Sequence, residues 1–213
     1  MNFRFRQVGL YFLFLLVLSF GTFAQRSSLR SVQMQLGELQ KELAPDKRVA
    51  IFHVSLSDTL RPVLTLKGRT DLPEAKTRII QILKKNGIQY VDSLVLLPVA
   101  SLGDKCWGLV NLSVVNMRSQ PDHAAEMVSQ ALMGMPVKVL DSSDNWYVIQ
   151  TPDLYLGWVE EHGLQRFSFA EMESWRQSKR CVFNRIVGNA YESANDKGAV
   201  ITDLVLTDLI IIK

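Results

Sequence analysis

The feature that most constrains the fold of this chain is a series of short, strand-like runs in its central part. Four such runs, separated by Gly, Pro, Asn and Asp, lie at residues 112–117, 135–141, 146–151 and 155–160. Short strands joined by tight turns are typical of a small β-barrel, so we expect one barrel over residues 106–165. Residues 124–132 are predicted to hold a short helical turn, which Gly134 and Pro136 end.

A different pattern precedes this region and predicts a small α+β unit over residues 49–100. Apolar residues alternate with less apolar neighbours in residues 49–56 and 60–67, and a run rich in Val and Leu follows at residues 89–97. Alternation of period two is typical of strands with one buried face. We therefore expect three strands in this unit.

Two helices are expected around these strands. Residues 25–48 are predicted to form an N-terminal helix, because apolar residues recur within them at helical spacing. Between the second and third strands, Asp71 and Glu74 have the spacing of a capping box, and Gly87 stands where a helix should stop. The α+β unit therefore has the predicted order strand, strand, helix, strand.

The end of the chain returns to strand-like runs after a polar and aromatic connector at residues 166–180. The expected strands lie at residues 182–187, 200–206 and 209–212. Residues 181–213 therefore predict the start of a second, incomplete barrel, because its last apolar strand would have nothing to cover it.

The first 24 residues have the layout of a secretory signal peptide. Arg4 and Arg6 precede an apolar run at residues 8–20, and Thr22 and Ala24 offer small residues before a cleavage site. The run is shorter than the roughly 20 residues of a membrane span, although an uncleaved anchor is the alternative. We expect a secreted protein of the periplasm or cell envelope, with membrane contact only through this segment.

Composition argues against several classes of function. The net charge of +3 is small and its basic residues are scattered, so no nucleic-acid partner is expected. His53, His123 and His162 lack metal-ligand spacing, and no metal or other cofactor is predicted. Cys106 and Cys181 have no disulfide framework around them, and we interpret them as two separate buried thiols.

One resemblance concerns the α+β unit. Residues 66–73, LKGRTDLP, followed by a helix, resemble the BON-like modules of exported bacterial proteins. The resemblance implies binding to envelope surfaces or to other proteins. The residues themselves favour a packing domain that positions the next one, because the unit shows no cluster of polar residues that would indicate a chemical function.

A second resemblance concerns the central region. The segments VNMRSQP (115–121), DNWYV (144–148) and DLYLGWV (153–159) resemble the bacterial SH3-like barrels that precede NlpC-type cell-wall cysteine peptidases. The most similar members are gamma-D-glutamyl-diamino acid endopeptidases, which cut muropeptides, and the block EMVSQALMG (126–134) strengthens the match. The fold class expected is α+β, with a BON-like domain, an SH3-like β-barrel and the start of a second barrel, which residues 182–206 fit.

The candidate site lies at the edge of the first barrel. On a strand, Asp153 and Tyr155 would point to the same side, where a carboxylate and a phenol can hold an ammonium group. The resemblance implies that the barrel fixes the free N-terminal L-Ala of a muropeptide or peptidoglycan stem peptide. Glu126 would offset the ammonium charge beside Tyr155, and Ser129 is a further substrate-binding candidate. The alternative is that Glu126 decorates the short helix and Tyr155 packs in the barrel, as Trp146 is expected to do.

No catalytic centre is predicted in this chain. The family needs a Cys nucleophile in an Asp-Cys-Ser context with a His downstream. Cys106 lacks that context, and no His follows Cys181. We therefore expect a recognition region whose peptidase domain lies downstream, with no catalysis by this chain alone. The alternatives are a stand-alone cell-wall or peptide-binding protein and an envelope protein–protein scaffold.

Overall fold

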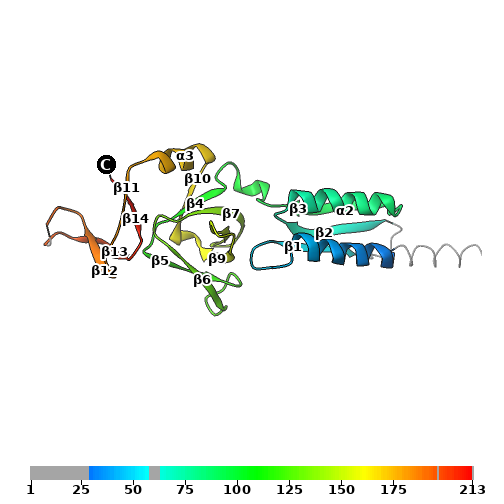
Figure 1. The fold of residues 1–213 in the computed structure, drawn as a ribbon, viewed down its shortest axis with the longest axis horizontal. Coiled ribbons are helices and arrows are strands. Elements are labelled where there is room, and N and C mark those ends of the chain that lie inside the picture. Colours follow the sequence, from blue (N-terminus) through cyan, green and yellow to red (C-terminus); the bar gives the residue numbers. More distant parts are fainter. Residues whose placement is uncertain (1–28, 58–62, 196, 213) are drawn as a thin grey trace, which may run out of the picture. The chain divides into compact units, whose positions relative to one another are not determined.

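The chain forms two compact units in a computed structural model that describes residues 29–57, 63–195 and 197–212 (Figure 1). The first unit contains the described residues up to Pro45 together with Phe52–Val95, and the second contains Asp46–Ile51 and the residues from Leu96 onward. The expected signal peptide lies outside the described residues. Within the described ranges, no helix is long and apolar enough to cross a membrane.

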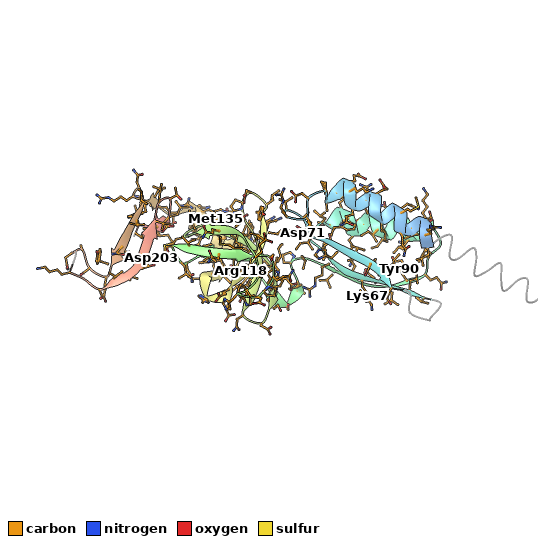
Figure 2. All side chains as sticks on the ribbon, turned by 90° about the horizontal axis from the view of Figure 1, so that it is seen from below. Lys67, Asp71, Tyr90, Arg118, Met135 and Asp203 are labelled. Carbon is orange, nitrogen blue, oxygen red and sulfur yellow. The ribbon has the colours of Figure 1, made fainter. Side chains whose placement is uncertain are left out.

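The first unit has two helices and a three-stranded sheet. One helix covers residues 29–43, and the other is α2 (Pro73–Lys85). The strands are β1 (Phe52–Ser57), β2 (Leu64–Thr70) and β3 (Tyr90–Leu96), in the sheet order β1-β2-β3. The predicted order of strand, strand, helix and strand is confirmed. Figure 2 shows both helices on one side of the sheet.

The core of the first unit lies between these two layers. Its buried side chains come from the apolar stripes of both helices and from alternate positions of the strands: Val32, Leu36, Leu39, Phe52, Leu64, Leu66, Ala75, Ile79, Leu83 and Leu94. The i, i+4 spacing of Ala75, Ile79 and Leu83 places them on one face of α2, which explains why that face is buried.

The start of α2 differs from the sequence prediction, and its end agrees with it. The N-cap is Leu72, without a side-chain capping bond, so the expected capping box of Asp71 and Glu74 is wrong. Proline is favoured at the first position of a helix. Because Pro73 takes that position, the N-cap is the residue just before it, Leu72. Gly87 has a φ of 65° and follows the end of the helix, as expected.

The second unit is built on a seven-stranded sheet with the order β10-β4-β7-β8-β9-β5-β6. Its strands are β4 (Trp107–Val110), β5 (Val114–Arg118), β6 (Met127–Leu132), β7 (Pro136–Ser143), β8 (Trp146–Gln150), β9 (Leu156–Glu160) and β10 (Leu164–Phe167). The four predicted runs correspond to β5, β7, β8 and β9. The sheet order ends at β6 and β10, which form its two edges, so strand pairing does not close this sheet into the barrel expected over residues 106–165.

Alternate positions of these strands fill the core of the second unit. Val115, Met117, Val137, Val139, Ile149 and Val159 are among its buried residues. Trp146 is also buried, as expected. Period-two burial, as in the pattern of β9, is what a strand with one face on a core produces.

Three local predictions in this unit are wrong or incomplete. Residues 124–132 hold strand β6 and no helical turn, because pairing with β5 along its length decides the conformation of this stretch. Strands β4 and β10 were not predicted. They have four residues each and pair with one another across a long sequence separation, so local patterning carries little signal for them.

The connector contains a helix, and two small antiparallel sheets follow it. Helix α3 (Phe169–Gln177) begins at a capping box formed by Ser168 and Glu171. Strand β11 (Arg180–Val182) pairs with β14 (Leu209–Ile211), and β12 (Val187–Tyr191) pairs with β13 (Val200–Val205). The strand expected at residues 182–187 is therefore split between β11 and β12.

The two cysteines are free thiols. Cys106 is half-buried, and its Sγ lies 3.3 Å from the Gly103 carbonyl oxygen. Cys181 is exposed, so the prediction of two buried thiols is wrong for it. Its strand, β11, has no buried position, which explains the difference.

Candidate functional site

Strands β6 and β9 carry the two main candidate residues to the same end of the sheet. Both strands run antiparallel to β5, which lies between them, and they are therefore parallel to each other. A Cβ added at Gly157 would lie 3.4 Å from Val128 Cγ2, so the Val128 side chain of β6 reaches Gly157 of β9. Glu126 and Tyr155 each lie two residues before this contact.

Glu126 stands at the end of an ordered turn between β5 and β6. Its side chain is exposed, and its carbonyl accepts a 2.9 Å hydrogen bond from the Ser119 amide. Arg118, marked in Figure 2, donates from Nη1 to the Ala125 carbonyl at 2.7 Å. These bonds close the turn and fix the backbone from which the Glu126 side chain projects.

Tyr155 and Asp153 belong to the turn before β9. Tyr155 is half-buried against the core, whereas Asp153 is exposed. The buried Thr151 organises the turn, because its hydroxyl lies within hydrogen-bond distance of both Asp153 Oδ1 and the Tyr155 carbonyl. Leu154 has a φ of 69° and β9 begins only at Leu156, so strand alternation does not apply to Asp153 and Tyr155. The expectation that alternation puts both groups on one side is wrong.

Ser129 lies further along β6 than Glu126. It is half-buried and stands opposite Met117 of β5. The structure thus carries Glu126 and Tyr155 to one end of the sheet and leaves Ser129 nearer the middle of its strand.

Sequence reasoning missed an ion pair beside Tyr155. Arg48 Nε lies 3.0 and 3.1 Å from the two carboxylate oxygens of Asp46, and its Nη2 lies 2.7 Å from Oδ2. The side-chain hydrogen bond from Arg48 is the main cause that lowers the pKa of Asp46 to about 2. The hydrogen bond to Asp46 in turn raises the pKa of Arg48, and the neighbouring Tyr155 side chain acts in the same direction.

No local sequence signal could have found this pair. Asp46 and Arg48 lie in a stretch that was predicted as the end of the N-terminal helix, far from the central strands in sequence. They reach the site because the Arg48 carbonyl accepts a 2.8 Å hydrogen bond from the Leu156 amide.

A second cluster brings together two histidines that the sequence separates. His123 Nδ1 and His162 Nδ1 each lie 3.2 Å from a different carboxylate oxygen of Glu160. The His123 ring also meets Trp146 edge-on, with ring centroids 5.2 Å apart. In the part of the chain that the structure describes, no group of three or more His, Cys, Asp or Glu could hold a metal ion.

Comparison with known families identifies the central region. Residues 117–164 match the family model described as the bacterial dipeptidyl-peptidase SH3 domain. This segment, which includes β6 to β9 and both main candidate residues, is therefore a bacterial SH3 domain of the dipeptidyl-peptidase type. No curated protein matches the chain.

Two solved structures match part of the chain at low identity. An NlpC/P60 endopeptidase from Photobacterium damselae subsp. piscicida matches 55% of this chain and 29% of its own, with 16% identity and a TM-score of 0.42. An NlpC/P60 family protein from Bacillus cereus matches 50% of this chain and 47% of its own, with 14% identity and a TM-score of 0.41. The chain spans less than half the length of either structure.

Proposed function

We propose that this chain is the recognition region of an exported peptidoglycan stem-peptide endopeptidase and that its SH3 domain binds the free N-terminal L-Ala of muropeptides. The family match of residues 117–164 supports a peptidase-associated SH3 domain. The observation that carries the proposal is that β6 and β9 run parallel. The exposed carboxylate of Glu126 and the phenol of Tyr155, which directly precede these strands, therefore lie at the same end of the sheet.

Each candidate residue has a role that its chemistry allows. The Glu126 carboxylate offsets the charge of the peptide ammonium and accepts its hydrogen bonds, which are strong because both groups are charged. The Tyr155 hydroxyl contributes a neutral donor or acceptor beside it. Asp153, held by Thr151, supplies a second carboxylate, and Ser129 contacts the peptide further along β6.

The remaining parts of the chain serve this role. Residues 1–24 direct export to the periplasm or cell envelope. Residues 49–100 form a BON-like module, and residues 181–213 belong to a second SH3-like barrel. Bond cleavage belongs to a separate catalytic domain, since Cys106 lacks the Asp-Cys-Ser context of the nucleophile and no histidine follows Cys181.

Calorimetric titration with a stem tripeptide, L-Ala-γ-D-Glu-diaminopimelate, tests the proposal. We expect binding of the free peptide and none of its N-acetylated form, which has no ammonium group. Glu126→Gln should weaken binding about tenfold or more, because it removes a charged hydrogen-bond acceptor. Glu161→Gln changes an exposed carboxylate elsewhere on the same domain and should leave the affinity unchanged. Equal binding of the acetylated peptide, or full affinity in Glu126→Gln, would contradict the proposal.

A further inference from the structure

Residues 46–51 form a strap on the SH3 domain, held by backbone groups and by one apolar side chain. The Arg48 carbonyl accepts from the Leu156 amide at 2.8 Å, and the Val49 carbonyl accepts from Gln150 Nε2 at 3.1 Å. Ile51 packs against the cluster that contains Leu140 and Val148. None of these anchors uses the Arg48 side chain, so the strap can hold its position when that side chain is changed.

The strap presents the Arg48 guanidinium in a fixed orientation. Asp46 engages Nε and Nη2, and an arginine whose one edge is held in this way still has the hydrogens of Nη1 to donate. The side chain is 66% exposed and lies beside Tyr155. Its interaction with the Tyr155 side chain helps to raise the pKa of Arg48. A guanidinium already held in place loses less side-chain entropy when it binds a ligand.

The charged groups at this end of the sheet therefore have both signs. Glu126 and Asp153 are carboxylates, whereas Arg48 is a cation that lies next to Tyr155 and is paired with the carboxylate of Asp46. A site of this kind suits a ligand that carries an ammonium group and a carboxylate a few bonds apart. Guanidinium groups match carboxylates in charge and in planar geometry.

We propose that Arg48, positioned by Asp46, is a specificity residue that binds a carboxylate of the peptide ligand. This inference rests on the proposed function, which places the peptide ammonium at Glu126 and Tyr155. In an L-Ala-γ-D-Glu peptide, the γ linkage leaves the α-carboxylate of the glutamyl residue free, one residue from the ammonium group. That carboxylate is the group that Arg48 would contact.

Two peptides that differ only in this group provide the test. Titration calorimetry compares L-Ala-γ-D-Glu-diaminopimelate with its glutamyl α-amide, which keeps the ammonium and loses the negative charge. We expect wild type to bind the acid about tenfold more tightly, as one charge-assisted pair allows. Arg48→Gln should bind both peptides with the affinity that wild type has for the amide. Asp46→Asn, which frees the guanidinium, should give an intermediate preference.

Controls separate the failure of this inference from that of the proposed function. Arg185→Gln changes an exposed arginine elsewhere and should keep the wild-type preference. Hydrogen exchange at the Leu156 amide reports whether the strap stays bound in Arg48→Gln. Equal binding of acid and amide by wild type, or an unchanged preference in Arg48→Gln, would overturn the role of Arg48 and leave the proposed function standing. Binding of neither peptide by folded wild type would overturn the proposed function and this inference with it.

Discussion

The hydroxyl of Ser113 donates a 2.6 Å hydrogen bond to Oδ2 of Asp203, a residue 90 positions further along the chain. Ser113 is buried beside β5, whereas Asp203 is exposed on strand β13, where Figure 2 marks it. The Leu209 amide adds a 3.0 Å bond to the Met133 carbonyl. These two hydrogen bonds attach the C-terminal sheets to the SH3 domain.

The first prediction concerns this attachment. Ser113→Ala should weaken it by about 1–3 kcal/mol, because the bond has a charged acceptor and Asp203 loses its partner hydroxyl. Amides of β12 and β13 should then exchange with solvent faster, while those of β7 and β8 keep their protection. Ser142→Ala, which changes an exposed hydroxyl of β7, is the matched control. Unchanged exchange in β12 and β13 would show that other contacts hold this segment.

The second prediction concerns Asp208, whose side chain is fully buried and whose Oδ2 accepts from the Val205 amide at 2.8 Å. Burial raises the pKa of this carboxyl, the backbone amides of Val205 and Met133 oppose the shift, and the charge of Asp203 adds to it. The folded state therefore holds the proton more tightly than the unfolded state. Ionisation of Asp208 therefore lowers the free energy of unfolding as the pH rises from the ordinary aspartate range through the raised pKa.

Asp208→Asn should remove this cost, because the amide keeps an oxygen acceptor and carries no charge. The free energy of unfolding of the variant, relative to wild type, should increase as the pH rises from 4 to 7. Urea unfolding at several pH values measures the difference between the two proteins, in which the contributions of other carboxyl groups cancel. A difference that stays constant with pH, or that falls, would contradict the raised pKa.

The third prediction uses two glycines with opposite surroundings. A Cβ at Gly157 would lie 2.8 Å from Met117 Cβ, whereas one at Gly37 would have no atom within 4 Å. Gly157→Ala should push β9 away from β5 and cost about 1–3 kcal/mol of stability. Gly37→Ala, inside the helix at residues 29–43, should stabilise by about 0.5–1 kcal/mol. Thermal unfolding distinguishes the two signs, and a tolerated alanine at position 157 would mean that β9 does not need this close approach.

Much of the local structure could be predicted because its causes are local. Apolar alternation predicts β1 and β2, a run rich in Val and Leu predicts β3, and turn residues separate the runs that become β5, β7, β8 and β9. Helical spacing predicts the helix at residues 29–43 and α2. Local reasoning fails where a partner far along the chain decides the outcome, as at β6, whose pairing with β5 overrides the tendency towards a helical turn.

The candidate site divides in the same way. Residue types and a family resemblance lead from the sequence to Glu126 and Tyr155, because the motifs that carry them are continuous. The position of Arg48 beside Tyr155, and with it that of Asp46, depends on hydrogen bonds across long sequence separations, such as the one from the Gln150 side chain to the Val49 carbonyl, 101 positions apart.

The sequence by itself determined the kinds of element in this protein, their order and the SH3 character of its centre, because periodicity and turn chemistry act over a few residues. Only the tertiary structure decided which charged groups surround Tyr155 and which histidines share Glu160. Strand register and strap docking set those neighbours, and both depend on hydrogen bonds and packing between distant segments that no local pattern encodes.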